Sequence, residues 1–264
     1  MGALLRVEWF KLWKTNIIPF ILLAPAIVFM VAWNTNIDTE ELSGSKYLYA
    51  AMYANMAYAV MFLPLMTGVL ATLICRYEHQ SGGWKQLFAL PTTRGRVYVA
   101  KFTVVSMLTL CMQLLVLLAL LLVGYLKQYG EPFPTELLLR GIIGGWVATL
   151  PLIALMLWLS TLFQSLAAPF AVNVIFTIPT MLVLNSEKVA PYYPWGQPFL
   201  MMYVTGDEVD LFYVPWQQLL TVVGGSFVLF FCNRLYLFAA QGSVEDRILL
   251  TSKLDWLIIR MLTY

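Results

Sequence analysis

The sequence predicts an all-α, polytopic membrane protein with six transmembrane helices. Hydrophobic residues make up 61% of the 264 residues and charged residues only 11%, against roughly 25% in an average soluble domain. Six apolar runs each approach the ~20 residues that cross ~30 Å of hydrocarbon as a helix. The runs are Ile17–Trp33, Leu48–Ile74, Phe102–Leu126, Gly141–Ser160, Thr161–Leu184 and Leu211–Asn233. Runs of this length without polar alternation indicate helices rather than strands of a barrel.

The basic residues predict the orientation of these helices. Twelve of the sixteen lie in the N-terminus, the 75–101 loop or the C-terminus, which share one side of a six-helix topology. They are Arg6, Lys11, Lys14, Arg76, Lys85, Arg94, Arg96, Lys101, Arg234, Arg247, Lys253 and Arg260. Cytoplasmic loops carry an excess of Lys and Arg, so we expect both termini in the cytoplasm.

A short helix is expected over residues 3–15, before the first apolar run. Leu5, Trp9, Leu12 and Trp13 recur at i, i+4, i+7 and i+8 and form one apolar stripe, from which Arg6, Lys11 and Lys14 fall away. This pattern is typical of a helix that lies in the inner membrane interface with its basic side chains toward anionic headgroups. The alternative is a plain cytoplasmic extension of the first transmembrane helix.

The longest polar stretch between apolar runs follows the second run. Ser81–Gly83 breaks the chain there, Trp84–Ala89 has room for one or two helical turns, and Pro91 ends them. Arg94, Arg96 and Lys101 then lead into the third run.

The fourth and fifth runs carry packing and kink signals. Gly141, Gly144, Gly145 and Ala148 form overlapping small-xxx-small pairs that let another helix approach closely. Kinks or breaks are expected at three prolines, Pro151, Pro169 and Pro179. The outer loop 185–210 is rich in aromatic residues and proline, and we expect it to pack at the outer interface.

Two units are expected. Residues 1–238 form the six-helix transmembrane domain, and residues 239–264 form a cytoplasmic tail. Lys253 and Asp255 rule out a seventh transmembrane helix there. One face of the tail is apolar, so it predicts an amphipathic helix.

The absence of several kinds of functional residue from the sequence excludes several classes of protein. No charged residue falls inside the six runs, whereas proton-coupled transporters, voltage sensors and ion pumps keep such groups in the membrane. His79 is the sole histidine, and the sequence has no phosphate-binding loop and no metal-ligand pattern. We therefore expect no catalytic residue, no metal site and no ATP hydrolysis by this chain, and we interpret the three cysteines as inert packing residues.

Gln113 and Asn173 are polar residues within the apolar runs. Either they line a substrate path or, as such groups more often do, they hydrogen-bond to a neighbouring helix.

Three stretches resemble the permease subunit of type-2 ABC exporters, in the branch of bacitracin-resistance and lantibiotic-immunity transporters. Glu8-Trp9-Phe10-Lys11-Leu12 is similar to that family's E-x-x-K-L interfacial helix. The segment from Tyr77 to Lys101 resembles its E…G-x-W-K-x-L…L-P-x-x-R…Y-x-x-K pattern. The third stretch is Pro194-Trp195-Gly196-Gln197-Pro198 in the last outer loop.

The resemblance implies a set of sites and partners. A cytoplasmic coupling helix would dock against a separate ABC ATPase subunit, present in two copies, which binds the ATP and Mg. Its residues in this sequence are Gly82, Gly83, Trp84, Lys85, Gln86, Leu87 and Phe88. The interfacial helix would present Leu5, Glu8, Trp9, Lys11, Leu12 and Trp13. A second permease chain, identical or related, would complete the transporter.

The implied function is to export an amphipathic peptide antibiotic, or to expel it from the bacterial cytoplasmic membrane, which confers resistance or self-immunity. Membrane lipids are expected partners and nucleic acid is not. Two alternatives remain open: an immunity or scaffold protein without transport, and an ABC permease for a lipid, sodium or a hydrophobic drug.

Overall fold

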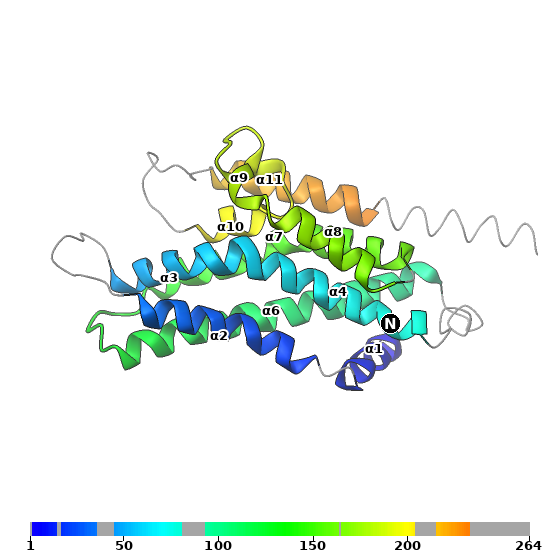
Figure 1. Cartoon of the computed structure of the whole chain (residues 1–264), viewed down its shortest axis with the longest axis horizontal. Coiled ribbons are helices and arrows are strands. Elements are labelled where there is room, and N and C mark those ends of the chain that lie inside the picture. Colours follow the sequence, from blue (N-terminus) through cyan, green and yellow to red (C-terminus); the bar gives the residue numbers. More distant parts are fainter. Residues whose placement is uncertain are drawn as a thin grey trace, which may run out of the picture.

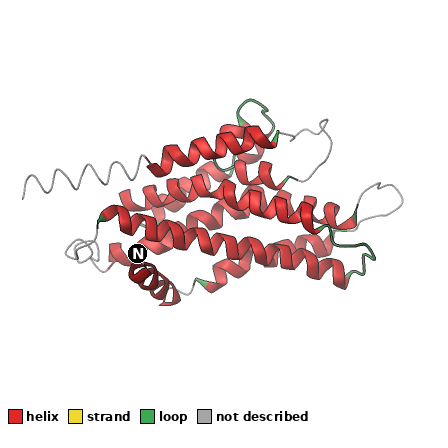
Figure 2. Cartoon of the chain, turned by 180° about the vertical axis from the view of Figure 1, so that it is seen from behind, coloured by secondary structure: helices red, strands yellow, loops and turns green. Residues whose placement is uncertain are grey.

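The computed structural model describes residues 2–14, 17–35, 45–80, 93–163, 165–203 and 215–232. Within these ranges every regular element is a helix (Figure 2). The elements are α1 (Gly2–Lys14), α2 (Ile18–Asn34), α3 (Lys46–Ala57), η1 (Tyr58–Phe62), α4 (Leu63–Gln80), α6 (Arg94–Leu126), α7 (Thr135–Leu162), α8 (Ala167–Thr177), α9 (Thr180–Leu184), η2 (Ala190–Tyr192), α10 (Gln197–Met202), α11 (Trp216–Phe227) and η3 (Val228–Cys232). The predicted tail 239–264 lies outside the described residues.

Four stretches of helix are long and apolar enough to cross a membrane: Lys46–Arg76, Gly95–Leu126, Thr135–Leu162 and Ala167–Leu184. Two shorter apolar helical stretches, Ile18–Asn34 and Trp216–Cys232, correspond to the first and last apolar runs of the sequence. The prediction of an all-α polytopic membrane protein is therefore confirmed. The first run was also the shortest by sequence, and α2 has 17 residues, about 26 Å at ~1.5 Å per residue.

The long helices lie lengthwise beside one another (Figure 1). Among them, α6 packs against α2 and α7, and α7 also packs against α4. α1 lies at an angle to these helices, at the end of the bundle where α4 ends and α6 begins (Figure 1). The loop between α6 and α7 lies at the opposite end (Figure 1).

The helix of the second run changes its winding before a proline. α3, η1 and α4 follow one another without a break, and η1 is a π-helical segment over Tyr58–Phe62. Pro64 lies just after it and has no N–H to donate to the carbonyl of Val60, four residues earlier. A local π-helical turn accommodates such a missing bond without ending the helix.

The three prolines expected to kink or break helices behave differently. Pro151 lies inside α7, which continues past it. Pro169 lies in the first turn of α8, where a missing N–H leaves no intrahelical bond unmade. Pro179 separates α8 from α9, so a break occurs at this position.

The outer segment before residue 204 enters the bundle rather than lying at its surface. All six residues of α10 are buried, and α10 packs against α7. A Cβ atom on Gly145 of α7 would come within 2.4 Å of the Met202 side chain. Gly141 and Ala148 are buried on the same helix. The small residues of α7 therefore accommodate a short inserted helix, and the position of this segment relative to the membrane stays a prediction.

Candidate functional site

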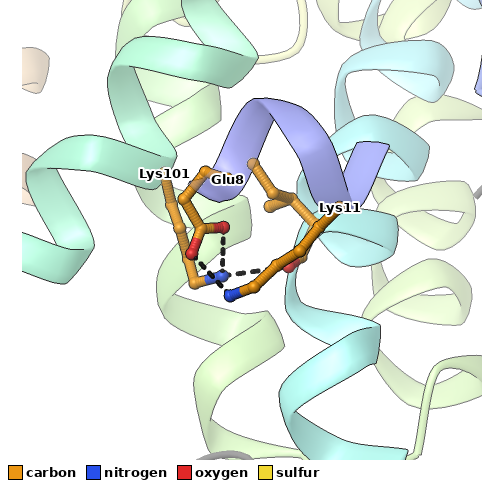
Figure 3. Close-up of polar contacts among 4 residues, drawn as sticks. Glu8, Lys11 and Lys101 are labelled. Carbon is orange, nitrogen blue, oxygen red and sulfur yellow. Dashed lines mark hydrogen bonds and ion pairs between the residues drawn. The ribbon is translucent and has the colours of Figure 1, made fainter. Parts of the chain in front are cut away.

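Glu8 of α1 is a charged residue in the interior of the bundle. Its side chain is 2% exposed and accepts hydrogen bonds from two lysines (Figure 3). Lys101 Nζ lies 2.8 Å from Oε2, and Lys11 Nζ lies 2.9 Å from Oε1. The two carboxylate oxygens are thus each paired with a different cation, which is the arrangement that a buried carboxylate needs.

Lys101 of α6 connects three helices through one ammonium group. The residue is 1% exposed, and its Nζ donates to Glu8 and also to the backbone carbonyl of Ile74 in α4, at 3.0 Å. α1, α4 and α6 therefore meet at one atom. Lys101 follows Arg94, the first residue of α6, by seven residues, about 10 Å along the axis at ~1.5 Å per residue.

The energetics of this pair favour a positioning role over a stabilising one. Desolvation of two charges offsets most of their attraction, so an intact buried pair contributes little net stability. Removal of Glu8 deprives the buried Lys101 ammonium of its carboxylate, which costs about 3–5 kcal/mol, whereas removal of Lys101 leaves Glu8 paired with Lys11. The pair therefore penalises any arrangement in which α1 leaves the surface of α4 and α6, as long as both charges stay in the apolar interior.

The face of α1 that contacts the bundle differs from the predicted apolar stripe. Leu12 is buried and Leu5 half-buried, as a packing stripe requires, but Glu8 lies between them and Trp9 is 44% exposed. The side chain of Trp13 lies outside the described residues. Because a helix against lipid can expose apolar side chains without loss, the exposed Trp9 is compatible with an apolar stripe that faces the membrane, and the interfacial position of α1 stays a prediction.

Lys101 was assigned by sequence to the cytoplasmic loop 75–101, and this assignment is wrong. α4 continues to Gln80 and α6 begins at Arg94, so both helices extend into the predicted loop. Lys101 thereby becomes an interior residue at the start of the third apolar run. The sequence did indicate that both residues matter, because Glu8 and Lys101 each fall in a stretch that resembles the ABC permeases. Nothing in the sequence indicates that the two side chains pair with each other.

The predicted coupling residues Gly82, Gly83, Trp84, Lys85, Gln86, Leu87 and Phe88 lie outside the described residues. Their flanks are described: they connect the end of α4 to the start of α6. Glu8 and Lys101 join those same two helices to α1.

Gln113 lies at the centre of a polar cluster in the bundle. The residue is fully buried; its Oε1 accepts from the Tyr58 hydroxyl at 3.1 Å, and its Nε2 donates to Met202 Sδ at 3.5 Å. Asn55 Nδ2 donates to the Met202 carbonyl at 3.2 Å. These bonds join α3, η1 and α6 to the inserted helix α10, and they support a structural role for Gln113.

Asn173 of α8 is likewise fully buried and bonded on both sides of its amide. Nδ2 donates to the carbonyls of Pro64 and Leu65 at 3.2 Å, and Oδ1 accepts from Trp195 Nε1 at 2.9 Å. The Asn173 side chain occupies the space that a Cβ on Gly68 would need, with Nδ2 only 2.1 Å from that position. Asn173 therefore holds α4, α8 and the segment around Trp195 together, and its role in a substrate path stays a prediction.

Metal chemistry finds no support among the described residues, which contain no group of three or more His, Cys, Asp or Glu side chains able to hold an ion. Cys75 is buried, whereas Cys111 and Cys232 are exposed, and all three are free thiols.

The chain was compared with known proteins and protein families. A family model described as "ABC-2 family transporter protein" matches residues 4–180, which is more than half of the 264-residue chain. No curated protein and no solved structure matches it at a significant level. The matched region contains both ends of the Glu8–Lys101 ion pair as well as the segment between α4 and α6. The chain belongs to the ABC-2 family of transporter proteins, and it is a membrane subunit of an ABC transporter.

Proposed function

We propose that this chain is the permease subunit of an ABC exporter that expels an amphipathic peptide antibiotic from the cytoplasmic membrane of a bacterium. Two copies of a separate ABC ATPase supply the energy, and a second permease chain, identical or related, completes the transporter. The observation that carries the proposal is the buried ion pair that fastens α1 to both α4 and α6, the helices that flank the coupling segment.

Force transfer follows from this arrangement. ATPase subunits that close on ATP would move the segment 82–88, and with it the end of α4 and the start of α6. The Lys101 ammonium joins those two helices to Glu8, so α1 moves with them rather than staying behind in the interface. The motion of one short segment is thereby distributed over three helices before it reaches the rest of the bundle.

The chemistry of the spans supports an amphipathic substrate. Gln113 and Asn173 are buried, with their amides in hydrogen bonds to neighbouring elements. No charged residue lies in the six apolar runs, so neither proton coupling nor recognition of a small ion by charge is favoured. A peptide that already partitions into the membrane needs no charged path, because burial of its apolar face in lipid is favourable.

The test is a coupling assay on the assembled transporter. The chain is purified from cells that also express its partner ABC ATPase, and the double variant Trp84→Ala/Phe88→Ala is compared with wild type. We expect the double variant to insert normally, to lose at least ten-fold of peptide-stimulated ATP hydrolysis, and to lose resistance to the peptide. The matched control is Trp33→Ala/Phe20→Ala on α2, where both aromatic side chains are exposed; it should stay within two-fold of wild type.

Two outcomes would contradict the proposal. If no ATPase co-purifies with the wild-type chain, a scaffold or immunity protein without transport is the better description. If the ATPase co-purifies but the double variant stays fully coupled, the coupling site lies elsewhere. A panel of lipids and hydrophobic drugs in the same assay tests the substrate class separately, because a stronger response to any of them than to peptides would overturn that part alone.

A further inference from the structure

A cavity of about 390 Å³ opens where α1 turns into α2. Trp9 and Leu12 of α1 form one side, Ile18 and Ile21 of α2 another, and Leu108 of α6 a third. Its volume lies within the ~300–1,000 Å³ typical of small-molecule sites. The cavity is close to the ion pair, because Leu108 follows Lys101 by seven residues, two turns along the same face of α6.

The lining of this cavity is mainly apolar. Among the described residues it consists of aliphatic side chains, one tryptophan and one proline. A cavity lined mainly by apolar side chains holds water unfavourably, since a buried water needs two or more hydrogen bonds. An occupant of this site is therefore a hydrocarbon group rather than a solvated one.

The cavity is open at the surface of the protein, where apolar side chains that line it are exposed. Ile18 is 55% exposed and Trp9 is 44% exposed, although both line the cavity. Leu22 and Leu23, which follow on α2, are also exposed. An acyl chain of the surrounding bilayer thus reaches the opening directly from the side.

The exposed charge of α1 is positive. The carboxylate of Glu8 is buried and neutralised by its lysine partners. Arg6 is exposed and precedes Trp9 by three residues, so the two side chains are neighbours on the helix surface. A guanidinium next to an apolar cavity at the membrane interface matches a phospholipid whose acyl chain enters the cavity and whose phosphate stays at the headgroup level.

We infer that the α1–α2 cavity binds one acyl chain of an anionic phospholipid, whose headgroup pairs with Arg6. The bound chain fills the space between α1, α2 and α6, so the lipid and the Glu8–Lys101 pair together set the position of α1. The inference concerns the surrounding bilayer and goes beyond the proposed transport of a peptide, since it requires neither a substrate nor an ATPase.

The test is native mass spectrometry of the full chain. The protein is purified in detergent, incubated with equimolar phosphatidylglycerol and phosphatidylcholine, and transferred to lipid-free detergent before measurement. We expect wild type to retain one phosphatidylglycerol. Ile21→Trp fills the cavity and should reduce the retained lipid at least five-fold, whereas the control Leu22→Trp, at a 51% exposed position outside the lining, should stay within two-fold of wild type.

A second variant separates the headgroup from the acyl chain. Arg6→Gln should leave the total retained lipid within two-fold of wild type and reduce the preference for phosphatidylglycerol over phosphatidylcholine at least three-fold. The inference is overturned if wild type retains no lipid, or if Ile21→Trp and Leu22→Trp lose it equally. Should Ile21→Trp not fold, Leu108→Phe is the replacement variant, because it narrows the cavity from the side of α6. Full lipid retention by Leu108→Phe would also overturn the inference.

Discussion

Glu8 and Lys101 carry opposite charges into an apolar part of the bundle, and each satisfies the other. Lys11 differs from both, since its side chain is 18% exposed and keeps some access to solvent. Loss of one partner of a buried ion pair strongly lowers the free energy of unfolding. Loss of a partly solvated partner costs less, because water can take its place. The three residues therefore differ in what their removal costs, although all three belong to one cluster.

Glu8→Gln should destabilise the chain strongly, because it leaves Lys101 without its carboxylate. The expected loss is about 3–5 kcal/mol, measured as a lowered Tm in detergent. Glu8→Gln/Lys101→Met should recover most of that loss, because neither of the two buried charges remains and Lys11 is partly exposed. Lys11→Met is the control and should cost less than about 1 kcal/mol. Additive effects of Glu8→Gln and Lys101→Met would show that the two side chains are not coupled.

Gly68→Ala tests the contact between α4 and α8. The new Cβ would lie 2.1 Å from Asn173 Nδ2, so the amide has to move away from the Pro64 and Leu65 carbonyls at a cost of about 1–3 kcal/mol. Gly224→Ala in α11 is the control, since nothing lies within 4 Å of its Cβ position. It should be neutral or stabilising by up to about 1 kcal/mol. An equal Tm for the two variants would contradict the close contact.

At the scale of elements, hydrogen bonds from Trp195 and Gln197 hold the described residues between α9 and the end of α10. Trp195 Nε1 donates to Asn173, and Gln197 Nε2 donates to the Pro191 carbonyl at 3.0 Å and to Ser226 Oγ at 3.3 Å. Met202 receives bonds from Asn55 and Gln113. A short helix of six residues has little stability of its own, so these contacts and its burial explain why α10 forms.

Trp195→Phe should loosen this segment. The ring keeps its apolar packing, but Asn173 Oδ1 loses its donor inside the bundle, which costs about 1–3 kcal/mol. Trp33→Phe is the matched control at a 44% exposed position and should leave the Tm nearly unchanged. Combining Trp195→Phe with Asn173→Ala should cost less than the sum of the two single variants. Full additivity in that cycle would argue against the bond.

At the scale of the whole molecule, the two ends of the bundle are expected on opposite sides of the membrane. Ser186 is exposed in the turn after α9, and Gly83 lies in the connection between α4 and α6. The positive-inside rule assigns the end that carries α1 to the cytoplasm. This orientation is a requirement of the proposed function, because an ATPase can reach the segment 82–88 only from inside the cell.

Cysteine labelling of intact cells tests this orientation. In a background without Cys75, Cys111 and Cys232, Ser186→Cys should react with a membrane-impermeant maleimide, and Gly83→Cys should react only after the cells are opened. Labelling of Gly83→Cys from outside would reverse the topology and exclude the coupling site. Labelling of neither cysteine in opened cells would mean that both positions are covered in the assembled transporter.

Composition and run length determined the class of this protein, because lipid allows few backbone solutions and each apolar run admits only a helix. They also located the N-terminal helix α1 and the break at Pro179, since both depend on local sequence. Tertiary structure alone decided the partners: Glu8 with Lys101, which are 93 residues apart, Asn173 with Trp195, and α10 with the glycines of α7. Periodicity cannot supply these pairings, because helices in a membrane expose apolar side chains to lipid as readily as to protein, and only the packed bundle distinguishes the two environments.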